Sequence, residues 1–332
     1  MRTGVFEGWR GVLLTLVIGT VLTAVAIAVA LWASRDYEGV GEIIRTEPGA
    51  VTLPGELVCR ATGTPEPVDG PVGARSVVAL RSGEALVLAG DGQMWRGDPF
   101  SGALEPWTAG PRPADLGVGE PLLLGEEPIR RDVFVVGTDA VAAVDVRTGA
   151  VRARQPLPDG VRVVSVTATT RQVYLVAESG ELYAAGWAYR RIGEVHPADT
   201  RDVPPVHRAL ASRDGKVLLL STDGPLTRMA TATGGGQPLP VPAVTADAMT
   251  IGWDGLVHLA DGAQVHVLDL GDGWVTGRLS DPVTEWASEP VALAGLERGL
   301  VVVGADGSVR TTAYPQCNRE ELTRLPATTE GS

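Results

Sequence analysis

Evenly spaced hairpin turns are the feature of this 332-residue chain that most constrains its fold. Asp-Gly occurs nine times, and short apolar runs flank several of these pairs. This arrangement favours a tight type I′ hairpin, because both central residues of that turn need positive φ. The central hairpin turns recur about every 43 residues, near Asp91, Asp139, Ser179, Asp223, Asp261 and Asp306.

Each unit around these turns has the pattern of four short strands. In the first unit, apolar residues 77–80 and 85–89 precede Asp91, and residues 93–96 and 104–107 follow it. Four strands in 40–45 residues is typical of a β-propeller blade. Six units fit between residues 75 and 316, so we expect an all-β, six-bladed propeller. An atypical blade at 51–75 would make seven, and a β-sandwich is the rival fold.

Two units resemble the repeat of quinoprotein-type (PQQ-like) β-propellers. In residues 95–107 and 143–151, a strand leads to an Asp, then to Ser-Gly or Thr-Gly, then to a second strand. The Asp side chain caps this turn, and the Gly supplies positive φ. The resemblance implies a propeller fold. It implies no cofactor, because many members of families with this repeat are scaffolds that bind no quinone.

An uncharged apolar run of 22 residues occupies 12–33. A helix of this length spans about 33 Å, which matches a hydrocarbon core of about 30 Å. Trp9 and Trp32 would then lie in the two headgroup layers. We expect a transmembrane helix. A cleaved signal peptide is the alternative, since residues 28–30 have small side chains at the spacing of a cleavage site.

Net charge limits the class of partner. The chain has 40 acidic and 28 basic side chains, a formal charge of −12. Such a domain repels phosphate backbones, so we expect no nucleic-acid partner. The expected organisation is a cytoplasmic N-terminus at 1–11, the transmembrane helix at 12–33, a linker at 34–50, the propeller at 51–317 and a largely disordered tail at 318–332.

The two cysteines lie on either side of the repeat. Cys59 precedes the first unit, and Cys317 follows the last, which shows only three strands of its own. If residues 50–60 supply the missing strand, the cysteines come within bonding reach. A disulfide implies an oxidising compartment, which places the propeller on the extracytoplasmic side of the plasma membrane. Two unrelated buried thiols are the alternative.

The sequence offers no catalytic constellation. It has no G-x-S-x-G elbow and no phosphate-binding glycine loop. His258 and His266 flank a hairpin and would need a third ligand to hold a metal, for which Asp269 is a weak candidate. We prefer cross-strand packing or exposure for these histidines. The sequence therefore predicts no enzyme, no metal and no cofactor.

Tryptophan is the remaining candidate for recognition. Most tryptophans of a propeller pack between blades, but Trp187 and Tyr189 beside Arg190 and Arg191 suggest a contact patch. We expect a membrane-anchored, non-catalytic scaffold or accessory subunit of a cell-envelope complex, with a protein partner. A module that binds wall glycan or a small ligand is the alternative, and a divergent hydrolase or dehydrogenase is the third.

Overall fold

The computed structural model describes residues 57–318, apart from 129–130, 189, 199, 201–202, 213–214, 222–225, 231–235, 240, 242–243 and 271–276. The expected transmembrane helix, with Trp9 and Trp32, lies outside the described residues, as do the N-terminus, the linker and almost all of the tail. Within the described part, no helix is long and apolar enough to cross a membrane.

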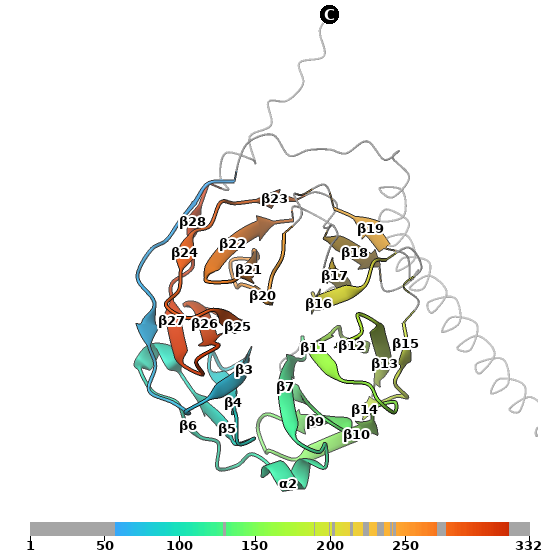
Figure 1. Cartoon of the computed structure of the whole chain (residues 1–332). Coiled ribbons are helices and arrows are strands. Elements are labelled where there is room, and N and C mark those ends of the chain that lie inside the picture. The colour runs from blue at the N-terminus through green and yellow to red at the C-terminus, as the bar shows by residue number, and fades with distance from the viewer. Residues whose placement is uncertain are drawn as a thin grey trace, which may run out of the picture. The chain divides into compact units, whose positions relative to one another are not determined.

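The described chain forms six sheets of four or five antiparallel strands, which confirms the all-β, propeller-like expectation (Figure 1). The first three sheets contain β3 (Ala74–Ala79), β4 (Ala85–Ala89), β5 (Met94–Gly97) and β6 (Glu105–Pro106); β7 (Pro121–Glu126), β8 (Asp132–Gly137), β9 (Ala140–Asp145) and β10 (Val151–Pro156); and β11 (Val163–Ala168), β12 (Gln172–Ala177), β13 (Leu182–Ala188), β14 (Arg191–Ile192) and β15 (His196–Pro197).

The remaining sheets follow in chain order, and one of them borrows a strand from the start of the propeller. They contain β16 (Val206–Ala211), β17 (Lys216–Ser221), β18 (Thr227–Ala230) and β19 (Gly236–Pro238); β20 (Ala248–Ile251), β21 (Val257–Asp261), β22 (Gln264–Asp269), β23 (Arg278–Leu279) and β24 (Thr284–Glu285); and β25 (Pro290–Leu296), β26 (Gly299–Gly304), β27 (Val309–Thr312) and β2 (Glu66–Pro67). Two short helices, η2 (Pro99–Ser101) and α2 (Pro113–Leu116), lie in the loops of the first two sheets.

The innermost strands form a closed ring. Strands β3, β7, β11, β16, β20 and β25 are neighbours in this order, and β25 returns to β3. Hydroxyls join neighbouring inner strands: Ser165 Oγ and Thr167 Oγ1 of β11 accept the N–H groups of Ala209 (3.4 Å) and Ala211 (2.8 Å) on β16. The partners advance together along both strands, so the two strands are parallel. The ring therefore has one end with strand starts and another with strand ends.

The core lies between the sheets. Successive side chains of a strand point to opposite faces, so each sheet packs against both of its neighbours. Strand β8 shows this well, because Phe134 and Val136 pack with residues of the third sheet, while Val133 and Val135 pack with the first. Every residue of β8 is buried. These apolar strands therefore cannot leave the ring without exposing two interfaces.

The ring closes in a way that differs from the sequence expectation. Strand β2, rather than residues 50–60, completes the sixth sheet by pairing with β27. The N–H of Val68 extends this pairing to the carbonyl of Val309 at 3.0 Å. The described part of 51–75 otherwise adds only the first residues of β3 and the short strand β1 (Cys59–Arg60), which belongs to a two-stranded sheet outside the ring, and it forms no seventh blade.

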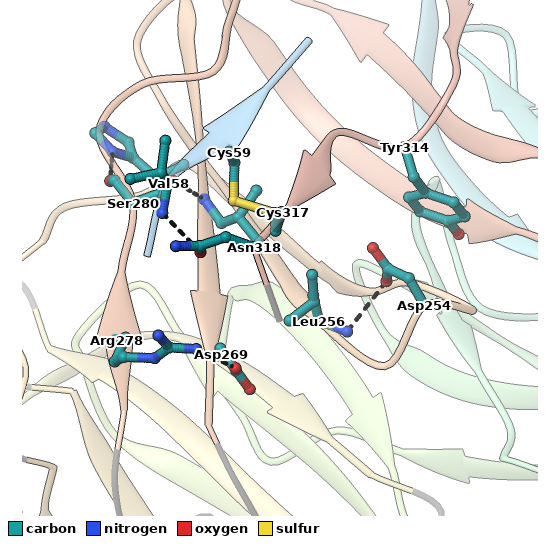
Figure 2. The surroundings of a disulfide bond; sticks show 12 residues. Val58, Cys59, Asp254, Leu256, Asp269, Arg278, Ser280, Tyr314, Cys317 and Asn318 are labelled. Carbon is teal, nitrogen blue, oxygen red and sulfur yellow. Dashed lines mark hydrogen bonds and ion pairs between the residues drawn. A yellow bond between two sulfur atoms is a disulfide. The ribbon is translucent and has the colours of Figure 1, made fainter. Parts of the chain in front are cut away.

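The predicted disulfide between Cys59 and Cys317 is confirmed (Figure 2). Strand β1 pairs with β28 (Gln316–Cys317) as a separate two-stranded sheet, in which the two cysteines lie opposite each other. The pair is extended by Val58 N–H, which donates to Asn318 Oδ1 at 3.1 Å. Leu57 packs with Leu256 and Val267 of the fifth sheet. The disulfide-linked pair of strands β1 and β28 thus holds both ends of the propeller against the fifth sheet.

The hairpin turns that the structure describes lie where the repeat places them, but none of them has the two successive positive φ values of a type I′ turn. In the loop 90–92, Gly92 N–H donates to the Ala89 carbonyl (3.0 Å), and only Gly92 has a positive φ, of 81°. Asp91 Oδ1 accepts the N–H of Gln93 at 2.9 Å. A third loop residue lets Asp91 keep negative φ and leaves the left-handed position to glycine. The same loop recurs at 81–83, 178–180, 253–255 and 305–307.

The two turns that resemble the quinoprotein repeat have the expected geometry. Asp145 Oδ1 accepts the N–H groups of Arg147 (2.9 Å) and Thr148 (2.7 Å), and Gly149 has φ 71°. Asp98 Oδ1 accepts the N–H of Phe100 at 3.0 Å, and Gly102 has φ 102°. In both turns a carboxylate caps the backbone and a glycine reverses it.

Candidate functional site

Two cavities lie along the axis of the ring. The larger, of about 510 Å³, opens where the inner strands end. The smaller, of about 290 Å³, extends from the starts of those strands and shares Glu126, Thr167, Leu210 and Thr250 with the larger one. We call the first opening the tryptophan mouth, after its lining residues Arg81, Glu126, Thr167, Thr250 and Trp253. We call the second the bulge mouth, after Arg75, Val164, Arg208 and Val291.

Trp253 is the exposed tryptophan of the described chain. Trp253 is 54% exposed, whereas Trp107, Trp187 and Trp286 are each less than 10% exposed. Trp253 is the first residue of the three-residue loop 253–255, and Arg81 holds the same position in the loop 81–83. Because the first loop residue lies outside the strand ladder, its side chain is not drawn between sheets. Both residues line the same cavity.

Contacts on both sides of the loop hold Trp253 in place. Its N–H donates to the hydroxyl of Tyr314 at 3.0 Å, and that hydroxyl donates to the carbonyl of Leu296 at 2.6 Å. The Tyr314 ring stacks on His258, with centroids 5.3 Å apart and planes 29° apart. His258 is fully buried, and its Nε2 lies 3.3 Å from Asp254 Oδ2. Tyr314, from outside the loop, and Asp254, within it, therefore fix the loop backbone. Figure 2 shows Tyr314 near Asp254 and the hydrogen bond between Asp254 and Leu256.

Hydroxyl groups line the wall of this cavity. Thr167 Oγ1 already accepts the Ala211 N–H, so its own proton is left to donate. Thr250 is 6% exposed, and within the described residues its hydroxyl has no hydrogen-bond partner. Arg81 is exposed and forms no ion pair with any residue that the structure describes. The half-buried Glu126 contributes a carboxylate. The cavity wall thus has both donors and acceptors.

The bulge mouth is built by a repeated irregularity. Near its start, the first strand of five sheets skips one residue in its pairing with the second strand. A β-bulge bends its strand and re-aims the side chain of the extra residue. The unpaired residues are Arg75, Leu122, Val164, His207 and Val291.

The surface at this mouth combines exposed apolar residues with an ion pair, in which Arg75 Nη1 lies 2.8 Å from Glu120 Oε1. Val291 is 40% exposed, and Val72, in the loop that leads into β3, is 96% exposed. Arg208 Nε donates to the carbonyl of Asp247 at 2.7 Å, and burial lowers the pKa of its guanidinium. Burial, with a smaller effect of Arg208, also lowers the pKa of His207. This histidine is therefore more easily neutral than a solvated one.

The contact patch predicted around Trp187 is not assembled as expected. Trp187 is 6% exposed and packs edge-to-face on Phe134, with ring centroids 5.1 Å apart, so its ring is part of the core. Tyr189 lies outside the described residues. Arg190 and Arg191 are exposed at the turn into β14, where Arg190 has φ 59°. A surface role for these two arginines stays a prediction.

The two histidines of the fifth sheet do not face each other. His258 pairs with Val267 and His266 pairs with Leu259, so the register is offset by one residue. That offset places the two rings on opposite faces of the sheet. His266 instead contacts the carbonyl of Ser280 at 3.1 Å, and Asp269 is paired with Arg278 at 3.0 Å. Among the described residues, no group of three or more His, Cys, Asp or Glu side chains is arranged to hold a metal.

Sequence reasoning did not single out Trp253 from the other tryptophans. The available signal was its position: it directly precedes Asp-Gly, in a loop, whereas the buried Trp187 lies inside a strand. A large aromatic residue in a tight loop has no neighbouring sheet to cover it. The Ser-Gly loop 81–83 carries the same signal for Arg81.

Comparisons with known proteins bear on the fold. No family model and no curated protein matches this chain. Three solved structures are similar to it: a protein of unknown function from Bacteroides thetaiotaomicron VPI-5482 (TM-score 0.54, 12% identity, covering 78% of this chain and 76% of that one), the WD40 repeats of RRP9 (0.51, 11%, 78% and 99%) and U3-55K (0.51, 10%, 78% and 98%). At such low identity the likeness shows a β-propeller fold and nothing about activity.

Proposed function

We propose that this chain is a membrane-anchored, extracytoplasmic β-propeller that acts as a non-catalytic protein-interaction scaffold, as an accessory subunit of a cell-envelope complex. The observation that carries the proposal is the exposed apolar surface where the inner strands start: Val291 lines the bulge mouth together with Arg75, and Val72 lies in the loop that leads into β3. Exposed apolar side chains next to arginine are typical of protein interfaces.

The rigidity of the ring supports this role. Strands β25 and β3 are neighbours, so Val291 and the loop with Val72 belong to adjacent sheets. The disulfide between Cys59 and Cys317 and the pairing of β2 with β27 hold these sheets together. A preformed surface lowers the entropy that a partner must overcome on binding. The acidic charge of the chain favours a partner with basic groups around its apolar contact.

Location is the second part of the proposal. The uncharged run at 12–33 is long enough to span a bilayer, and the disulfide favours an oxidising compartment outside the cytoplasm. The turns at Asp98 and Asp145 support the resemblance to quinoprotein-type propellers, with no quinone proposed. If the span is an anchor, the mature protein starts at Met1 or Arg2. A first residue at Leu31 would show a cleaved signal instead.

In-cell photo-crosslinking of the full-length chain tests the scaffold. A photoreactive amino acid replaces Val291 in one strain and Val58 in another. Val58 is the control because it is at least as exposed (46%, against 40% for Val291) but lies beside the disulfide. We expect one envelope protein, in near-equal amount, to be captured from position 291 and not from 58. Val291→Glu should reduce its recovery at least tenfold without changing the melting temperature. Capture of no protein above background at 291, or equal capture at both positions, would refute the scaffold.

A further inference from the structure

The opposite end of the ring has a different chemistry, and we propose that the tryptophan mouth is a binding site for a short saccharide. One sugar ring stacks on Trp253, and its hydroxyls reach Thr250 and Arg81. This site goes beyond the protein scaffold proposed above, because it lies where the inner strands end, whereas the bulge mouth lies where they start.

The aromatic platform is exposed, and hydrogen bonds fix the backbone of the loop that carries it. A sugar ring presents a face of C–H groups, which packs on the flat apolar face of an indole. Trp253 is 54% exposed, and its loop is fixed by the hydroxyl of Tyr314 and by Asp254, which accepts the Leu256 N–H at 3.1 Å. Because the loop is already ordered, a ligand loses little free energy in ordering it.

The polar groups match a polyol. Sugar hydroxyls both donate and accept, so they need both kinds of partner in one place. Thr250 supplies an unpartnered hydroxyl among the described residues, Arg81 supplies up to five N–H donors, and Glu126 supplies acceptor oxygens. Water can reach this hydroxyl in the open cavity, so a ligand that displaces the water must replace its hydrogen bond. The Thr250 hydroxyl therefore favours a ligand with hydroxyls over an apolar one.

The size of the cavity and the charge of the chain limit the class of ligand. The cavity, of about 510 Å³, falls within the usual range of small-molecule sites, about 300–1,000 Å³, and accommodates one or two sugar rings. Its wall alternates Leu210 and Ile251 with the polar groups. The net charge of the chain is −12, which disfavours phosphate-rich ligands such as nucleotides.

Ligand-detected saturation-transfer NMR tests this site. The full-length chain is held in a detergent that has no sugar headgroup, and the probes are chitotriose, cellotriose, maltotriose and trigalacturonate. We expect at least one probe to bind with a dissociation constant of 1 mM or lower. Trp253→Ala should weaken that binding at least tenfold. Binding of no probe by the parent protein, or equal binding by Trp253→Ala, would overturn the proposal.

A pair of isosteric variants separates the site from general stability. Thr250→Val removes only the cavity hydroxyl and should weaken binding at least threefold with an unchanged melting temperature. Thr312→Val is the matched control, because Thr312 is also 6% exposed but lies on β27, away from this cavity. Equal binding by both variants would show that the Thr250 hydroxyl does not contact the saccharide.

The experiments can refute the protein scaffold and the saccharide site separately. Val291→Glu should leave saccharide binding unchanged, and Trp253→Ala should leave crosslinking from position 291 unchanged. A photoreactive residue at 253 that captures the same protein partner would show that this mouth is a protein interface and would overturn the saccharide site. Loss of crosslinking at 291 with sugar binding retained would refute the scaffold alone.

Discussion

Removing the disulfide between Cys59 and Cys317 measures how much the closure of the ring depends on one covalent bond. The bond joins residues 258 positions apart. In the chain-entropy model, a loop of that length restricts the unfolded chain by up to about 5.5 kcal/mol at 25 °C. Unfolding some 260 residues gains about 0.55 kcal/mol per kelvin of entropy near the midpoint, so the upper limit corresponds to a melting temperature lowered by about 10 °C.

The folded ring should survive this change. Strand β2 still completes the sixth sheet through Glu66 and Pro67, and Leu57 still packs on Leu256. We therefore expect the Cys59→Ser/Cys317→Ser variant to keep the native spectrum while melting about 5–10 °C below the parent. Scanning calorimetry of the full-length protein in oxidising buffer provides the measurement.

Reductant provides the internal control. The chain has only two cysteines, so a reductant acts on this bond alone. It should lower the melting temperature of the parent to that of the double variant and leave the variant unchanged. Equal melting of the parent with and without reductant would refute the reasoning. Loss of the native spectrum in the variant would show that β2 cannot close the ring by itself.

Three further predictions concern the turns. Gly149→Ala and Gly160→Ala both place a side chain at positive φ (71° and 78°), but a Cβ at 149 would lie 1.7 Å from the Ala109 carbonyl oxygen, whereas none lies within 4 Å at 160. Urea unfolding should therefore show a loss of about 1 kcal/mol for Gly160→Ala and more than about 3 for Gly149→Ala, and similar losses would contradict the clash. Asp145→Ala removes the turn cap and the ion pair with Arg152, and should cost about 2–4 kcal/mol; Asp145→Asn, which keeps the capping oxygen, should cost less, and equal costs would show that the cap contributes little. Hydrogen bonds from the Ser308 hydroxyl and N–H lower the pKa of Asp306, so its stabilisation is present above the unfolded pKa of about 4 and is lost as pH falls through the lower folded value. Below about pH 4 the melting temperature of the parent should fall more steeply than that of Asp306→Asn, and parallel curves would argue against this link.

Local signals in the sequence were sufficient for the architecture. Alternating apolar runs and turn residues act over a few neighbours, so the repeat near Asp91 and Asp306 predicted the sheets and the place of their hairpins. The positions of Cys59 and Cys317 on either side of the repeat predicted their disulfide, because a closed ring brings the two ends of its repeat together. The turns at Asp98 and Asp145 behave as their residues indicate, since the cap and the glycine lie within the same few residues.

Closure of the ring and exposure of side chains were decided by contacts between segments far apart in the chain. The register of β21 and β22 is local by contrast: the two-residue loop 262–263 sets it and puts His258 and His266 on opposite faces. Strand β2, rather than residues 50–60, completes the sixth sheet. Local sequence could not predict this pairing, because the partner strand β27 lies some 240 residues away. Trp187 is buried by Phe134 of the neighbouring sheet, whereas Trp253 leaves its sheet in a loop and stays about half exposed. Composition treats these tryptophans alike, and only the packing of one sheet on the next separates a core residue from a binding surface.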